Sequence, residues 1–165
     1  MRDSTVLVVA LLLCCVSAAA SDLVDPAALL FSRSPAPASA EWSKRTETHC
    51  LALNIYHEAR GESLEGQLAV AAVTLNRVRS RKFPEQVCEV VWQRRQFSWT
   101  HDGKSDLPRN LKAWKSALRI ANAILDIGHV NVVGGATHFH AAYVRTPYWT
   151  RKKQMIRRIG SHLFY

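Results

Sequence analysis

The chain carries the tract IYHEARGE at residues 55–62, and the apolar stretch GQLAVAAVTLNRV follows it at residues 66–78. Apolar side chains at helical spacing predict a first helix over about residues 46–60, and Gly61 is well placed to end it. The second stretch predicts another helix after Ser63, a good N-cap residue. Apolar side chains cover much of the circumference of this second helix, so we expect it to be the buried central helix of the fold.

Glu58 lies in the last turn of the first predicted helix, beside the apolar second helix. Burial in such surroundings disfavours the charged form of a carboxyl, which raises its pKa and makes it a general acid. Glu58 is therefore the first catalytic candidate. The alternative is a purely structural ion pair with Arg60 or with another arginine, which is a common role for a charged side chain.

The dipeptide His57-Glu58 also resembles the start of a zinc-protease motif. That motif needs a second histidine four residues after the first, and position 61 is Gly, so the sequence excludes a protease of this class.

Glu62 follows Glu58 by four residues. On one helix this spacing would give a pair of carboxyls as in a glycosidase. Because Gly61 is expected to interrupt the helix, the alternative role of Glu62 is to cap the second helix, where a carboxylate meets the positive end of the dipole.

The rest of the sequence predicts two further helices and then a region rich in β-formers. A short helix is expected over residues 84–91, and a longer amphipathic helix over residues 110–126, with Gly128 at its end. Residues 130–143 and 148–165 are rich in β-branched and aromatic side chains, which is typical of a small sheet or of long ordered loops. The predicted fold class is α+β, mainly α, with a small β part near the C-terminus.

The first residues have the pattern of an export signal. Residues 6–16 form an apolar run and residues 18–20 are all Ala, so residues 1–20 are predicted to be a cleaved signal peptide. Residues 21–45, rich in Pro, Ala and Ser, predict a flexible leader. Residues 46–165 have the length of one compact domain. Since no other stretch suits stable membrane insertion, we expect an exported protein of the periplasm or cell wall, with secretion as the alternative.

Two cysteines, Cys50 and Cys88, remain after the predicted signal peptide is removed. An oxidising compartment favours a disulfide between them, which would close a loop of about 38 residues and stabilise the fold by roughly 4 kcal/mol. Two buried thiols that act as small hydrophobic side chains are the open alternative.

The chain is strongly basic, with 22 Lys and Arg against 13 Asp and Glu and a formal net charge of +9. Such a charge implies an anionic partner. Nucleic acid is not expected, because the basic residues form no recognisable binding motif, and export favours cell-wall polymers or anionic lipid. The alternative is that Lys152, Lys153, Arg157 and Arg158 form a solvated charged face.

The tract at residues 55–62 is the first of an ordered series of sequence blocks. It continues through residues 63–78, and the later blocks are Phe83-Pro84, Val87–Val91, Gln96–Trp99, Asp102-Gly103, Thr137–His140 and Ile159–Tyr165. Together these blocks closely resemble the SleB-type cell-wall hydrolases, the spore-cortex-lytic family. The resemblance covers about residues 51–165.

The resemblance implies a peptidoglycan-cleaving enzyme with a lysozyme-like or lytic-transglycosylase-like single domain, in which Glu58 is the catalytic acid. Members of this type cut between N-acetylmuramic acid and N-acetylglucosamine. Glu58 would protonate the glycosidic oxygen and then accept a proton from the muramic acid's own 6-hydroxyl, which leaves a 1,6-anhydro sugar. The implied role is wall remodelling on glycan strands, with no cofactor and with an unidentified regulatory protein that restrains cleavage.

Two other functions stay open. A hydrolytic muramidase would use water and a second carboxylate about 5 to 9 Å from Glu58, and Glu62 and Asp102 are candidates for it. A non-catalytic basic domain that binds wall polymer would not need Glu58 at all.

The same blocks supply candidate substrate-binding residues, through polar groups that hydrogen-bond to sugars and aromatic faces that stack on them. These are Glu62, Gln67, Phe97, Ser98, His138, Phe139, His140 and Tyr143, with Asn76, Trp99 and Tyr148 as further candidates. His138 and His140 alternate as in a strand and would share one face, but a metal site needs a further ligand that the sequence does not identify. We therefore expect no metal.

Overall fold

The computed structural model describes residues 36–165, with side chains from residue 46 onward. The predicted signal peptide and the first part of the predicted leader lie outside the described residues. Helix α2, Ala36–Ala59, begins earlier than the predicted start near residue 46, so the last part of the predicted leader is helical. In the described part of the chain, no helix is both long and apolar enough to cross a membrane.

Residues 55–59 of the first tract form the end of α2, and residues 66–78 form most of helix α3, Leu64–Arg79. Ser63 caps α3 as predicted, because its Oγ accepts a hydrogen bond from the backbone N–H of Gly66 at 3.3 Å. Every residue from 69 to 75 on α3 is buried. The prediction of a buried central helix is therefore confirmed.

Helix α4, Val87–Val91, lies against α2 and begins later than predicted. Glu47 on α2 accepts hydrogen bonds from the backbone N–H groups of Val87 and Cys88, at 2.6 and 3.2 Å, and so satisfies free donors at the start of α4. Further along α2, Cys50 forms a disulfide with Cys88, and their Cα atoms are 5.2 Å apart. Of the two alternatives for the cysteines, the structure has the disulfide.

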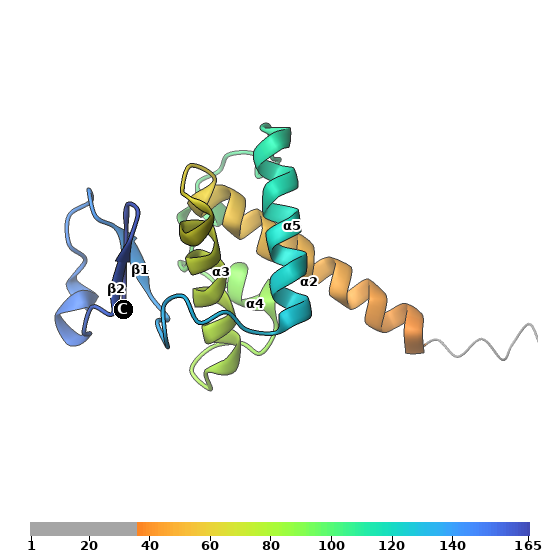
Figure 1. Ribbon diagram of the computed structural model, residues 1–165, viewed down its shortest axis with the longest axis horizontal. Helices are drawn as coiled ribbons and strands as arrows, with labels where there is room; N and C mark the ends of the chain where they lie inside the picture. The colour runs from red at the N-terminus through yellow and green to blue at the C-terminus, as the bar shows by residue number, and fades with distance from the viewer. Residues whose placement is uncertain (1–35) are drawn as a thin grey trace, which may run out of the picture. The chain divides into compact units, whose positions relative to one another are not determined.

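Helix α5, Leu111–Ile127, packs against α2 (Figure 1). Asn110 caps its start by accepting a hydrogen bond from the backbone N–H of Ala113 at 3.0 Å. Gly128 ends it with a φ of 81°, a conformation that glycine adopts without strain. Both ends lie within one residue of the predicted ones.

The C-terminal region forms an antiparallel sheet of β1, Phe139–Ala141, β2, Arg157–Ile159, and β3, His162–Phe164, with β3 in the middle. A core cluster that includes Val73 and Phe164 joins the sheet to α3. Helix α3 therefore lies between the sheet on one side and α2 and α5 on the other (Figure 1). The predicted α+β class, mainly α with a small β part, is confirmed.

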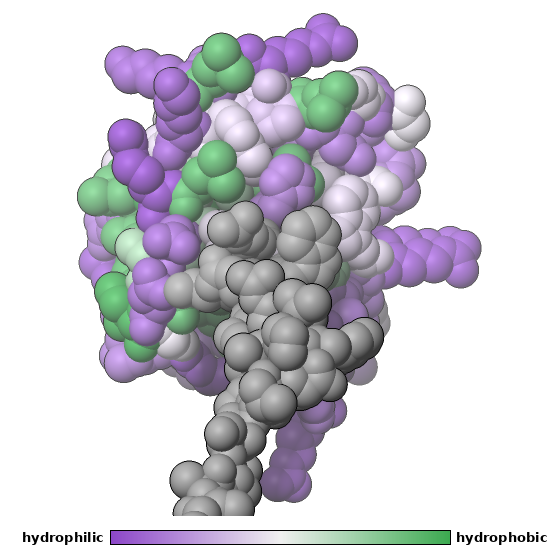
Figure 2. All heavy atoms as spheres, turned by 90° about the vertical axis from the view of Figure 1, so that its right-hand side faces the viewer, coloured by the Kyte–Doolittle hydropathy of each residue, from purple (hydrophilic) through white to green (hydrophobic). Residues whose placement is uncertain are grey.

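The surface of the described domain is largely polar on the face drawn in Figure 2, which views the right-hand side of Figure 1. Hydrophilic side chains project over most of this face, and hydrophobic side chains gather only in small groups.

Candidate active site

A cavity of about 450 Å³ lies where the end of α2, the second half of α3, the segment 95–101 and the sheet come together. Its wall is formed by His57, Glu58, Arg77, Arg95, Gln96, Phe97, Ser98, Trp99, His101, Phe139, His140, Ala141, Tyr143 and His162. Among the described residues, Glu58 is the one carboxyl that lines this cavity. The residue that the sequence selected first thus lies in the wall of a cavity that the helices and the sheet form together.

Glu58 sits in the last turn of α2 and is partly buried against α3, as the sequence predicts. Burial raises the pKa of this carboxyl to about 7, and the charge of Arg77 lowers the same pKa by a smaller amount. At neutral pH a large fraction of Glu58 is therefore protonated, which is the state in which a carboxyl donates a proton.

Arg77 is a buried cation in the wall of the same cavity, and the sequence analysis did not select it. Its guanidinium lies over the rings of Phe97 and Phe83, 5.0 and 5.3 Å from their centroids, and its Nε donates a hydrogen bond to Thr137 O at 2.7 Å. Its Nη1 is buried and has no hydrogen-bond partner among the described residues. Burial lowers the pKa of Arg77 to about 10, against the opposing effect of Glu58, so the side chain stays charged at neutral pH.

The aromatic side chains divide between the core and the rim of the cavity. Phe97 and Trp99 are 2% and 7% exposed, so they form its floor and offer little face for stacking on a sugar. His57 stacks on Trp99 with centroids 4.5 Å apart. Tyr143 is 82% exposed at the rim, where its ring is free to meet a ligand.

The predicted substrate-binding residues that line the cavity are Phe97, Ser98, Phe139, His140 and Tyr143. His140 is buried on β1, and its Nε2 lies 3.1 Å from the hydroxyl of Tyr165. His138 and His140 both have ring contacts with Trp149, in agreement with the prediction that they share a face. No group of three possible metal ligands exists among the described residues.

Three of the predicted substrate-binding residues are not in the cavity wall: Glu62, Gln67 and His138. The side chain of Gln67 donates a hydrogen bond to the backbone O of Glu62 at 3.1 Å. Burial lowers the pKa of His138 to about 4, with Lys153 and Arg77 lowering it further, so this imidazole is neutral. Asn76 is also structural, because its Nδ2 donates hydrogen bonds to the backbone O atoms of Gly134 and Ala136 at 2.8 and 2.9 Å.

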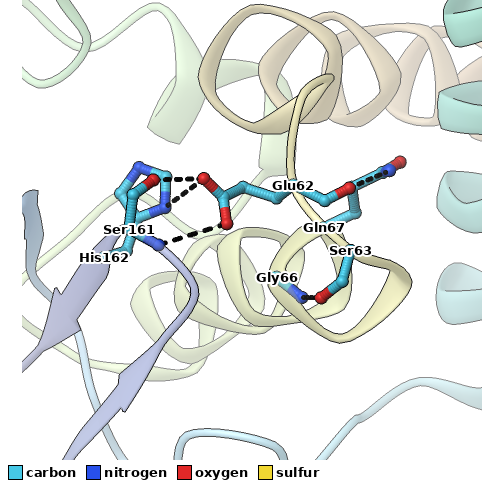
Figure 3. A network of polar contacts seen from close by, with 6 residues as sticks. All are labelled: Glu62, Ser63, Gly66, Gln67, Ser161 and His162. Carbon is cyan, nitrogen blue, oxygen red and sulfur yellow. Dashed lines mark hydrogen bonds and ion pairs between the residues drawn. The ribbon is translucent and has the colours of Figure 1, made fainter.

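Glu62 joins the start of α3 to the turn between β2 and β3 (Figure 3). Its carboxylate accepts hydrogen bonds from the backbone N–H of Ser161, at 3.3 Å, and from the hydroxyl of the same residue. Its Oε1 lies 3.8 Å from Nδ1 of His162. The expectation that Glu62 caps α3 is therefore wrong. Ser63 is the cap, and the Glu62 carboxylate accepts its hydrogen bonds from Ser161 in the turn between β2 and β3.

Asp102, the other candidate for a second carboxylate, does not line the Glu58 cavity either. It accepts a hydrogen bond from the backbone N–H of Lys104 at 2.9 Å and lines a separate cavity of about 370 Å³. Neither Glu62 nor Asp102 is thus among the residues that line the cavity of Glu58.

Residues 61–165 match the family model described as Cell Wall Hydrolase. The chain belongs to the cell wall hydrolase family. The resemblance to SleB-type hydrolases is confirmed, although the matched segment begins after Glu58, so the role of that residue depends on the cavity rather than on this match.

Several curated relatives are spore cortex-lytic enzymes. That of Oceanobacillus iheyensis is 35% identical over 120 residues, which are 73% of this chain and 41% of the relative. That of Bacillus subtilis is 35% identical over 114 residues, which are 69% of this chain and 35% of the relative. The chain thus spans well under half the length of these relatives.

Two solved structures are similar to the fold described above. The catalytic domain of the Bacillus cereus SleB protein has a TM-score of 0.58 and 34% identity, over 73% of this chain and 89% of that domain. The catalytic domain of the germination-specific lytic transglycosylase SleB from Bacillus anthracis has a TM-score of 0.58 and 35% identity, over 72% of this chain and 92% of that domain. This cell wall hydrolase therefore has the fold of a SleB catalytic domain.

Proposed function

We propose that this cell wall hydrolase cleaves the glycosidic bond between N-acetylmuramic acid and N-acetylglucosamine in peptidoglycan, with Glu58 as its catalytic acid. One observation carries the proposal: a carboxyl with a pKa of about 7 lies in the wall of a cavity of about 450 Å³. Such a group donates a proton to a leaving oxygen near neutral pH. The relatives are named spore cortex-lytic enzymes and the family model is described as Cell Wall Hydrolase, which supports a wall polymer as the substrate.

The mechanism that fits one carboxyl is that of a lytic transglycosylase. Glu58 gives its proton to the glycosidic oxygen as the bond from that oxygen to C1 breaks. The muramic acid's 6-hydroxyl then bonds to C1, and its proton is the one that returns to Glu58. No second carboxylate is required, in keeping with the lining of the cavity, and the product is a 1,6-anhydro sugar. The lytic transglycosylase named among the solved structures supports this choice.

Arg77 fits this cycle as a fixed positive charge. When Glu58 has lost its proton, the carboxylate lies in a poorly solvated wall and is stabilised by the nearby guanidinium. Because Arg77 lowers the pKa of Glu58 less than burial raises it, a large fraction of the carboxyl is protonated at neutral pH before the reaction, and Arg77 stabilises the carboxylate that remains after it.

The charge of the C-terminal region suits an anionic glycan. Residues 127–165 contain six Lys and Arg, at positions 145, 151, 152, 153, 157 and 158, and no Asp or Glu. Arg157 is paired with Glu65 at 2.9 Å, while Arg145, Arg151, Lys152 and Lys153 are exposed. We propose that they attract the carboxylates of peptidoglycan stem peptides, and that the protein acts in the periplasm or cell wall after export.

The test is mass spectrometry of the muropeptides released from purified peptidoglycan. The unchanged protein should release fragments that end in anhydro-muramic acid, lighter by one water than reducing ends. Glu58→Gln should release none, while Glu85→Gln, which alters an exposed glutamate outside the cavity, should behave as the unchanged protein. Reducing ends would instead mean hydrolysis by water, and equal release by Glu58→Gln would mean that the domain only binds the wall.

A further inference from the structure

His162 is a buried titratable group in the cavity wall, and it has no role in the cleavage reaction proposed for Glu58. It lies on the central strand β3, is 7% exposed, and lines the same cavity as Glu58. Its Nδ1 is buried, has no hydrogen-bond partner among the described residues, and faces Oε1 of Glu62 at 3.8 Å. A buried imidazole with a carboxylate behind it is an arrangement that holds and passes protons.

The carboxylate behind the ring is fixed in place. Ser161 donates both its backbone N–H and its hydroxyl to Glu62, and these hydrogen bonds are the main reason that the pKa of Glu62 is lowered. Glu62 is therefore ionised at neutral pH. In Figure 3 a dashed line joins one ring nitrogen of His162 to Glu62, and no dashed line reaches the other ring nitrogen.

The protonation state of the ring follows from these contacts. Burial lowers the pKa of His162, and His140 lowers it further, against the opposing effect of Glu62. The imidazole is therefore neutral near pH 7. Because Nδ1 faces a carboxylate, the ring proton belongs on Nδ1, which leaves the lone pair of Nε2 free to accept a proton. The cavity thus holds a protonated acid, Glu58, together with a neutral base.

We propose that His162, with Glu62 behind it, is the base that first takes the proton of the attacking hydroxyl during peptidoglycan cleavage. The inference rests on the proposed function. As the bond from the 6-hydroxyl oxygen to C1 forms, the hydroxyl proton moves to Nε2 of His162. The glycosidic bond breaks, its electron pair stays on the leaving oxygen, and that oxygen takes the proton of Glu58. The imidazolium later returns a proton to Glu58 through water, so the overall balance is that of the scheme with Glu58 alone.

The two schemes differ in how the rate depends on pH. With Glu58 alone, the rate falls only as pH rises through the pKa of the acid. With His162 as base, the rate also falls as pH drops through the pKa of the imidazole, which gives a bell-shaped profile. The titratable groups that face His162 are Glu62 before α3 and His140 on β1. The other charged or titratable groups that share its cavity are Glu58, Arg77, Arg95, His57, His101 and Tyr143.

The first experiment compares initial rates of muropeptide release over pH 4 to 9 for the unchanged protein and His162→Gln. We expect a loss of about 100-fold or more at the optimum, as for removal of a general base, and disappearance of the acidic limb. His129→Gln is the matched control, because His129 is exposed and lies outside the cavity. Added imidazole should partly restore the rate of His162→Ala, which a purely structural role would not allow.

A second variant tests the backing carboxylate with the imidazole intact. Glu62→Gln removes a charge that raises the pKa of His162, so the acidic limb should move to lower pH and the optimum rate should fall. The proposal is overturned if His162→Gln keeps the rate and the acidic limb, or if Glu62→Gln leaves that limb in place. Failure of the proposed function has a different signature, because Glu58→Gln would then retain activity or no anhydro ends would appear.

Discussion

Arg77 lies in the cavity wall close enough to Glu58 for its charge to lower the pKa of that carboxyl, yet burial dominates and the pKa is raised to about 7. The same burial lowers the pKa of Arg77 to about 10. Each group thus reduces the other's cost of burial, and the pair sets the pH range in which Glu58 is an acid.

Replacement of Arg77 should move that range. In Arg77→Met the lowering effect on Glu58 is lost, so the pKa of Glu58 rises further and the alkaline limb of the pH profile moves to higher pH. The optimum rate should fall, because the carboxylate formed in the reaction loses its counter-charge. Arg77→Lys keeps a positive charge, so its alkaline limb should lie between those of the unchanged protein and of Arg77→Met. An unchanged alkaline limb in Arg77→Met would contradict this account of the pair.

The raised pKa of Glu58 also predicts how stability depends on pH. Between pH 4.5 and about 7 the folded state binds more protons than the unfolded state, so the free energy of unfolding falls as pH rises through this window. Glu58→Gln removes the cost of burying an ionised carboxylate. It should therefore raise the free energy of unfolding at pH 8 by roughly 3 kcal/mol and change it little at pH 4. Urea unfolding at pH 4 and pH 8 measures this change in the free energy of unfolding. The control Glu85→Gln should change it equally little at both pH values.

The disulfide between Cys50 and Cys88 closes a long segment, with a sequence separation of 38 residues. Its removal should destabilise the fold by about 4 kcal/mol in the chain-entropy model. Thermal unfolding of the unchanged protein should therefore shift to lower temperature on addition of a reducing agent. The variant Cys50→Ser/Cys88→Ser should unfold at that lower temperature with or without the agent, and a response to reduction in this variant would point to another cause.

The exposed basic residues predict salt-sensitive binding to the wall. Arg151→Gln/Lys152→Gln should weaken binding to purified peptidoglycan at low salt and reduce the salt dependence of binding, because exposed charges are screened by ions. Lys112→Gln/Lys115→Gln on α5 removes the same number of exposed charges outside the C-terminal region and should have a smaller effect. Cosedimentation at several salt concentrations compares the two, and equal effects would show that only net charge matters.

Much of the fold could be predicted because the sequence features that determine each helix lie within that helix or within a few residues of its ends. Ser63 and Gly128 mark helix ends through contacts within a few residues, and the apolar periodicity of residues 66–78 is intrinsic to the helix it predicts. The raised pKa of Glu58 could be predicted for the same reason, since its apolar surroundings follow it directly in the sequence.

The parts of the site that were missed depend on contacts between distant segments. Glu62 has the position of a helix-capping residue in sequence, but its carboxylate binds Ser161, 99 residues away, and nothing in the tract itself signals that partner. Arg77 and His162 were visible only as members of family blocks. An arginine inside an otherwise apolar helix was the one local signal that would have selected Arg77.

The position of α3 between the helices and the sheet has a consequence for the folding chain. The cavity needs Glu58 from α2 and His162 from β3, which are 104 residues apart in sequence (162 − 58). In a partly folded chain whose sheet has not yet docked on α3, one wall of the cavity is missing, so we expect the Glu58 carboxyl to be more exposed to water and its pKa to lie closer to the ordinary value of 4.5. The docked sheet should thus complete the surroundings that raise the pKa of Glu58, and a molecule without it should lack the acid on which the proposed cleavage depends.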